Sequence, residues 1–201
     1  MADSHGDPEV IERSALFLKQ EGCTSLYHLG DICDTNRYDT ADACVERVSA
    51  HGILAVKGNN DHSLAADARG RPDCGIHIAT LTFLENLPLI RRVEGAALVH
   101  SRPFVGRLGL SAMIGTVGQK EAAGYFREKP RGLVFRGHSH KPEIISGAGG
   151  TIRFASLADA QVVDLAAQRP CIVTCGALYQ GMTLVWEPAA DRLTCRAVSQ
   201  G

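Results

Sequence analysis

Apolar runs of strand length alternate with stretches of helical spacing in the first half of the chain. A helix is predicted from Asp7 to about Gly22, because Asp7-Pro8-Glu9 combines an N-cap acceptor, a first-turn proline and an acidic residue. Residues 26–29 and 53–56 predict strands. Between them, residues 41–50 predict a second helix whose inward face is Ala41, Cys44, Val45 and Val48.

The second half of the chain is predicted to be largely β. Residues 89–93 and 96–99 predict a hairpin turning at Glu94-Gly95, and residues 119–129 predict a helix that Pro130 stops. Further strands are predicted at residues 133–135, 143–146, 151–154, 171–174, 182–186 and 193–198, with a short helix near residues 159–167. Residues 63–77 and 102–118 are predicted to be loops that set specificity, the first rich in Ala, Arg, Gly, Asp and Pro.

This order of elements predicts two packed sheets with helices outside, an α/β sandwich. The 201 residues are enough for a single domain over residues 1–201, although length alone also allows two small domains. Ligands of such sheets bind beyond the carboxyl ends of the strands. Polar motifs at those positions are therefore the candidates for function.

Composition narrows the class of protein. An apolar content of 45% and a charged content of 21% are typical of a globular chain, and a net charge of −1 predicts no basic surface for nucleic acid. The sequence shows neither an apolar run of membrane-span length nor a signal-peptide pattern, which predicts a cytoplasmic protein. Seven scattered cysteines, an odd number, predict buried reduced thiols rather than a disulfide framework.

Five short polar motifs follow apolar residues along the chain. They are Asp3-Ser4-His5, Gly30-Asp31-Ile32-Cys33-Asp34, Gly58-Asn59-Asn60-Asp61, His100 and Gly137-His138-Ser139-His140. Carboxylate, amide and imidazole ligands without thiolate suit divalent ions such as Mn, Fe, Co, Ni or Zn. Glycines precede ligand positions in three of the motifs, where a missing side chain allows close backbone approach.

The order D-x-H, G-D-x-x-D, G-N-x-D, H and G-H-x-H resembles the calcineurin-like metallophosphoesterases, from Asp3 to about His140. The resemblance implies a four-layer α/β/β/α sandwich of two mixed sheets and two divalent metal ions, with manganese foremost and Fe, Ni, Zn or Co as alternatives. It implies that the first ion is bound by Asp3, His5, Asp31 and His140. The second ion would be bound by Asn59, His100, His138 and again Asp31, which bridges the two.

The implied reaction is hydrolysis of a phosphate ester by a hydroxide that bridges the two ions. Two divalent ions, two carboxylates and this hydroxide leave a net charge of about +1, which attracts a phosphate. Asp34 and Asp61 are further candidates for the catalytic set, as residues that orient the ligands or Asn60. Arg102, two residues after His100, is a candidate for binding a phosphate oxygen, and a plain surface charge is the alternative.

One departure from the family indicates the substrate class. Serine/threonine phosphatases carry Gly-Asn-His-Glu, whose histidine is implicated in protonating the leaving group, whereas this chain has Asn60 at that position. Small bacterial phosphodiesterases also lack this histidine, and a diester with a good leaving group needs less proton assistance. We therefore expect a phosphodiesterase acting on a small phosphate ester. The alternatives are a dinucleoside polyphosphate or phosphoprotein phosphatase and a non-catalytic scaffold, and a homo-oligomer is left open.

The remaining polar residues are predicted to be structural or solvent-facing. His28, His51, His62 and His77 belong to no motif, with His62 the first exception to consider, and Lys57 and Arg136 are predicted to be strand-edge charges.

Only Met1 and Ala2 precede Asp3, where the resembling family has an apolar strand of about five residues. We expect either a sequence clipped at its start, the favoured interpretation, or a sheet that lacks its first strand. In this chain Asp3 and His5 are then expected to be poorly held.

Overall fold

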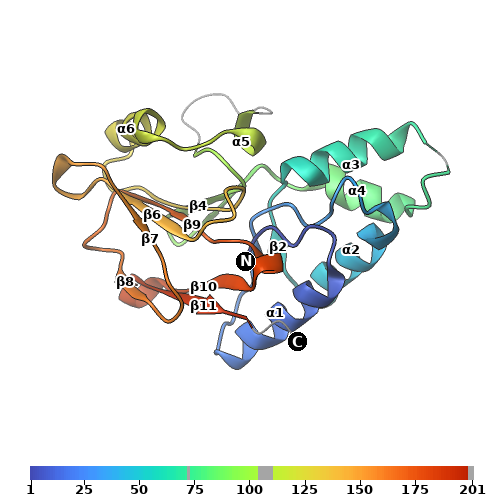
Figure 1. Ribbon diagram of the computed structural model, residues 1–201, viewed down its shortest axis with the longest axis horizontal. Coiled ribbons are helices and arrows are strands. Elements are labelled where there is room, and N and C mark those ends of the chain that lie inside the picture. The colour runs from blue at the N-terminus through green and yellow to red at the C-terminus, as the bar shows by residue number, and fades with distance from the viewer. Residues whose placement is uncertain (72, 104–110, 199–201) are drawn as a thin grey trace.

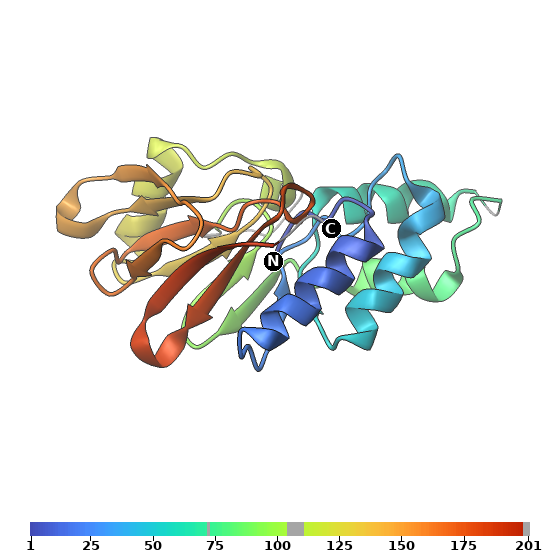
Figure 2. The same cartoon turned by 60° about the horizontal axis from the view of Figure 1, so that its bottom comes forward.

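The computed structural model describes residues 1–71, 73–103 and 111–198. Two layers of strands lie between two layers of helices (Figures 1 and 2). Three buried apolar clusters join these layers: one beneath the first helices, one between the strand layers, and one beneath the helix on the far side. The predicted four-layer α/β/β/α sandwich is therefore confirmed.

Four helices form the first outer layer: α1 (Pro8–Gln20), α2 (Ala41–Ala50), α3 (Asn59–Arg69) and α4 (Ile78–Asn86). The start of α1 is as predicted, because the Asp7 side chain accepts a hydrogen bond from Val10 N at 2.9 Å. The predicted inward face of α2 is also confirmed, since its buried residues are Ala41, Cys44, Val45 and Val48.

Short strands lie against these helices. β1 (Tyr27–His28) and β2 (Leu54–Ala55) pair in parallel. Residues 1–3 run beside β1, where Met1 N donates to Tyr27 O at 2.9 Å and Asp3 N donates to Gly30 O at 3.0 Å. On their other side, Leu178 N donates to Ala2 O at 2.8 Å. The expectation that Asp3 is poorly held is therefore wrong, because backbone hydrogen bonds fix this segment from both sides and Asp3 is fully buried.

Three strands continue this layer in antiparallel order: β10 (Met182–Glu187), β11 (Arg192–Ala197) and β8 (Val162–Asp164). Their side chains alternate between two faces, since Val185 packs toward the helices whereas Leu184 and Trp186 pack toward the other sheet. Beside Met1, a cavity of about 670 Å³ opens between the two layers of strands. No regular strand precedes α1 within the described residues.

The facing sheet has six strands: β3 (Ile90–Val93), β4 (Ala96–Val99), β5 (Leu133–Arg136), β6 (Glu143–Ser146), β7 (Arg153–Ser156) and β9 (Cys171–Thr174). Their order is β3-β4-β5-β9-β6-β7, with β4, β5 and β9 parallel and the other neighbours antiparallel. Leu133 and Phe135 face the other sheet, whereas Val134 faces the outer helix α6 (Gln119–Glu128). A short helix, α5 (Ser111–Ile114), precedes α6.

The loop predicted at residues 63–77 is wrong in its first half, because α3 continues through it to Arg69. Leu64, Ala65 and Ala68 form the buried face of this part of α3, and alanine and arginine are strong helix formers. Helix α4 was not predicted, since its apolar residues show no clean period. Of the predicted loop 102–118, residues 104–110 lie outside the described residues.

The helix predicted near residues 159–167 is also wrong, because residues 162–164 form strand β8. Val163 pairs with Leu193 of β11, so a tertiary partner and β-branched side chains decide the conformation. The strand predicted at residues 151–154 is displaced toward Ser156, because a 3₁₀ turn at Ala148–Gly150 precedes it.

The thiols and the helices bear on the cysteine and membrane expectations. All seven cysteines are free thiols, and five of them are buried. None of the described helices is long and apolar enough to cross a membrane.

Candidate metal centre

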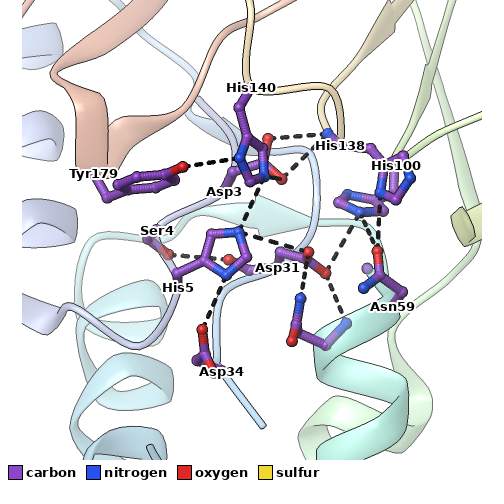
Figure 3. Close-up of polar contacts among 12 residues, drawn as sticks. Asp3, Ser4, His5, Asp31, Asp34, Asn59, His100, His138, His140 and Tyr179 are labelled. Atoms are coloured by element: carbon purple, nitrogen blue, oxygen red, sulfur yellow. Dashed lines mark hydrogen bonds and ion pairs between the residues drawn. The ribbon is translucent and has the colours of Figure 1, made fainter. Parts of the chain in front are cut away.

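The seven predicted metal ligands come together where loops leave the ends of the strands (Figure 3). Asp3 and His5 follow the first extended segment, Asp31 follows β1, Asn59 follows β2, His100 follows β4, and His138 and His140 follow β5. The ligands therefore come from both layers of strands and meet at their junction.

Asp3, His5 and His140 form the first group. The Nε2 atoms of His5 and His140 are 3.1 Å apart, and His140 Nε2 is 3.5 Å from Asp3 Oδ1. One ligand atom from each of the three residues lies within 4.8 Å of the others. Two imidazole nitrogens and a carboxylate oxygen converging in this way match the donor set of a divalent ion.

Asn59, His100 and His138 form the second group. Asn59 Oδ1 is 3.0 Å from His100 Nε2 and 3.0 Å from His138 Nδ1. A cation among these three atoms would satisfy all of them as acceptors. Without one, rotating the amide by 180° would let its nitrogen donate to both rings. The orientation with oxygen facing the rings is the one that a metal ion requires.

Asp31 lies between the two groups. Its Oδ2 is 3.9 Å from His5 Nε2 in the first group, and its Oδ1 is 3.4 Å from His100 Nε2 in the second. Burial would raise the pKa of Asp31, but hydrogen bonds and charge from His100, with the amide of Asn60, outweigh it and hold the pKa at about 2. Asp31 is therefore ionised at neutral pH and within reach of both groups.

The second ring nitrogen of three histidines is fixed by a hydrogen-bond partner outside the ligand set. His5 Nδ1 lies 3.1 Å from Asp34 Oδ2, and His100 Nδ1 lies 2.7 Å from the Leu29 carbonyl oxygen. The corresponding partner of His140 Nδ1 is the hydroxyl of Tyr179, at 2.9 Å. Such partners determine which nitrogen faces the metal. Asp34 was a sequence candidate for this role, whereas Tyr179 carried no sequence signal.

Asp61 lies beneath the ligands rather than among them. Its carboxylate accepts four backbone hydrogen bonds, from Asp31 N, Ile32 N, Cys33 N and Gly58 N, at 2.9–3.0 Å. Burial and the nearby Asp31 charge raise the pKa of Asp61 to about 6 despite these donors. Asp61 thus joins the loop that carries Asp31 to the loop that carries Asn59.

Asn60 is engaged with Asp31. Its backbone N donates to Asp31 Oδ1 at 2.8 Å, and its Nδ2 donates to Asp31 Oδ2 at 2.7 Å. The side-chain oxygen of Asn60 accepts from the Thr35 hydroxyl at 3.3 Å. Asn60 therefore positions the central carboxylate.

Five ligands adopt the left-handed backbone region, which is unfavourable for residues other than glycine. The φ angles are 57° at Asp3, 49° at His5, 57° at Asp31, 67° at His138 and 60° at His140. Such strain costs of order 1–3 kcal/mol per residue and clusters at functional sites. The fold holds these five residues in conformations that aim their side chains into one region.

Close glycine contacts keep the loops together, as the motifs predicted. A Cβ on Gly58 would lie 2.1 Å from both Asp31 N and Asp31 Oδ1, and a Cβ on Gly137 would lie 2.6 Å from Asp3 Oδ2. Only a residue without a side chain fits at these positions.

Gly58→Ala is therefore expected to displace Asp31 and to weaken metal binding at least about 10-fold, as loss of ligand support does. Calorimetric titration with Mn²⁺ measures the metal affinity. The matched control is Gly124→Ala in α6, where an added Cβ meets nothing within 4 Å. We expect that control to bind metal normally and to be more stable by about 0.5–1 kcal/mol. Equal metal affinity in the two variants would contradict the steric argument.

The other polar residues named from the sequence have hydrogen-bond or ion-pair partners outside the ligand set. Arg102 Nε donates to Thr116 O at 3.0 Å, and His77 N to Asp42 Oδ1 at 3.1 Å. His28 is fully buried, with Nε2 3.1 Å from the Ser4 hydroxyl, so its predicted structural role is confirmed. His51 Nε2 contacts Glu12 Oε2 at 2.9 Å.

Arg136 was predicted as a strand-edge charge, and this is wrong. It lies in β5, which has strand neighbours on both sides, and is 1% exposed. Its Nε donates to Ser101 O at 2.8 Å, and burial lowers its pKa to about 10. Lys57, by contrast, is half-buried and donates from Nζ to Glu85 O at 2.7 Å.

The sandwich fold and this cluster of carboxylate, amide and imidazole groups are those of a metal-dependent enzyme. Residues 1–156 match the family model of the calcineurin-like phosphoesterase superfamily domain. The chain belongs to this superfamily and is a phosphoester hydrolase of its metal-dependent class.

Solved structures share the fold. A metallophosphoesterase from Sphaerobacter thermophilus has a TM-score of 0.75 at 23% identity, over 99% of this chain and 87% of that one. A putative diadenosine tetraphosphatase has a TM-score of 0.58 at 18% identity, over 100% of this chain and 92% of that one. The protein TT1561 of Thermus thermophilus has a TM-score of 0.53 at 14% identity, over 99% of this chain and 97% of that one. No curated protein matches the sequence.

Proposed function

We propose that this protein is a phosphodiesterase that depends on two divalent metal ions, manganese foremost. The observation that supports it is the position of Asp31, with one carboxylate oxygen toward each of two ligand groups. The first group, with Asp31, would hold one ion and the second group the other. Because the ligands of both groups lie together, a non-catalytic scaffold is the weaker alternative.

When bound, the two ions supply a hydroxide near neutral pH and neutralise charge on the phosphoryl oxygens. The chain itself supplies the geometry of the ligands. Asp34 and the Leu29 carbonyl orient His5 and His100, so that both present Nε2 to the ions. Asp61 holds the backbone of the loop that carries Asp31 by accepting hydrogen bonds from Asp31 N and Gly58 N. In this proposal Asp34, Asn60 and Asp61 position the ligands.

The preference for a diester rests on Asn60. Its side-chain amide donates to Asp31 and accepts from Thr35, so both of its polar ends are engaged. A neutral amide in this position is not a general acid for a departing alkoxide. A diester with a good leaving group does not require one. Dinucleoside polyphosphates, which also have a good leaving group, are the second candidate substrates.

Hydrolysis of bis-p-nitrophenyl phosphate by the Mn²⁺-loaded protein tests the proposal. We expect turnover that falls to background after chelation and returns when Mn²⁺ is added. The p-nitrophenyl monoester should be hydrolysed more slowly than the diester, and a strong monoester preference would contradict the interpretation of Asn60. Absence of turnover with Mn, Fe, Co, Ni and Zn in protein that binds these ions would overturn the enzymatic proposal.

The proposed substrate is a small phosphate ester, and Arg102 remains a proposed contact to its phosphate. Arg102→Ala should then raise KM more than it lowers kcat.

We also propose a cytoplasmic location, which the seven unpaired thiols support.

A further inference from the structure

Tyr179 lies at the edge of the first ligand group (Figure 3). It belongs to a 3₁₀ turn, η3 (Leu178–Gln180), in a part of the sequence that carries no recognisable motif. Its hydroxyl is 2.9 Å from His140 Nδ1. Its ring packs edge-to-face against His5 and His140, with centroids 5.4 and 5.3 Å away and interplanar angles of 89° and 84°.

The hydrogen bond has a defined direction when His140 binds a metal. His140 Nε2 faces His5 Nε2 and Asp3 Oδ1, so Nε2 is the metal-facing atom and Nδ1 must carry the proton. Nδ1–H then donates to the phenolic oxygen of Tyr179. Gln180 Nε2 donates to the same oxygen at 2.9 Å. The phenolic oxygen, with two lone pairs, can accept both bonds.

The turn that carries Tyr179 is hydrogen-bonded to the segment that carries Asp3. Leu178 N donates to Ala2 O at 2.8 Å, and Tyr179 N is 3.5 Å from Asp3 O. The turn ends at Gly181, whose φ of 76° is accessible to glycine. Backbone hydrogen bonds therefore hold Tyr179 beside the segment that carries Asp3 of the first ligand group.

We propose that Tyr179 is a positioning residue for the first metal site, holding His140 with Nε2 toward the ion. The inference rests on the proposed two-metal function. It predicts an asymmetry between the sites, because in the second group the Leu29 carbonyl fixes His100 in the way that Tyr179 fixes His140. Loss of the phenolic oxygen should weaken the first site and leave the second unchanged.

Tyr179→Phe tests this, since it removes the oxygen and keeps the ring. We expect one Mn²⁺ to bind about 10-fold to 100-fold more weakly and the other to bind as in the wild type. Calorimetric titration gives the two affinities. At limiting Mn²⁺, electron paramagnetic resonance should show the isolated six-line spectrum in place of the exchange-coupled signal of a metal pair. Thermal unfolding of the metal-free variant should match that of the wild type.

Tyr38→Phe is the matched control, because its hydroxyl contacts Asp67 at 3.3 Å rather than a metal ligand. We expect this variant to bind both ions normally. If the wild type binds two ions and Tyr179→Phe binds them equally well, the role of Tyr179 is overturned while the proposed function stands. An equal loss at both sites would also overturn it. A wild-type protein that binds fewer than two ions would instead overturn the proposed function.

Discussion

Replacing Asp31 by alanine is expected to abolish binding of both metal ions, and hydrolysis with it. The two Asp31 oxygens are directed to different ligand groups, 3.9 Å from His5 Nε2 and 3.4 Å from His100 Nε2. Its carboxylate is one of two in the ligand set, so its loss leaves Asp3 alone to offset two divalent charges. We expect the rate of diester hydrolysis to fall at least about 100-fold to 1,000-fold, as when a single stabilising group is removed from an active site.

Asn60→Ala is the matched control for Asp31→Ala. Asn60 donates two hydrogen bonds to Asp31 but offers no atom to either ligand group, so we expect this variant to keep both ions. Elemental analysis of each variant after gel filtration measures the metal content directly. Retention of even one ion by Asp31→Ala at wild-type affinity would contradict the bridging position.

All of the ligands except Asp3 and His5 follow a strand of the fold, and this made their meeting predictable. β1 and β2 lie in one layer of strands and β4 and β5 in the other. Residues that follow these strand ends meet where the two layers adjoin, however far apart they are in the sequence. Asp31 and His138 illustrate this, since both directly follow a glycine at a strand end. The support of Asp3 could not be predicted. Ala2 and Asp3 are hydrogen-bonded to Leu178 and Tyr179, which lie far along the chain and in no motif.

The hydrogen bonds that orient the ligands were only partly predictable. Asp34 lies in the same motif as Asp31, so its role beside His5 could be proposed from spacing. Tyr179 reaches His140 only because η3 packs against residues 1–3, and Leu29 acts through its backbone, which has no sequence signature. Strand β8 was missed for a related reason, since its pairing with β11 is a tertiary contact that the local pattern does not contain.

Asp61→Ala is expected to cause the largest loss of stability among single substitutions in the site. The side chain is fully buried and accepts hydrogen bonds from four backbone N–H groups of the two loops that carry Asp31 and Asn59. Alanine would leave all four donors buried without a partner, and each such group costs about 1–3 kcal/mol. We expect the free energy of unfolding to fall by at least about 3 kcal/mol, a large share of the roughly 5–15 kcal/mol typical of a domain.

Urea denaturation of the metal-free protein measures this loss, so that weaker metal binding does not contribute to it. Asp61→Asn keeps the shape but replaces one acceptor oxygen by an amide nitrogen that faces backbone donors, so we expect an intermediate loss. The matched control is Asp39→Ala, an exposed aspartate, which should change stability by less than about 0.5 kcal/mol. If Asp61→Ala were as stable as this control, Asp61 would not be the link between the two loops. In that case the close contact of Gly58 with Asp31 would have to hold them together.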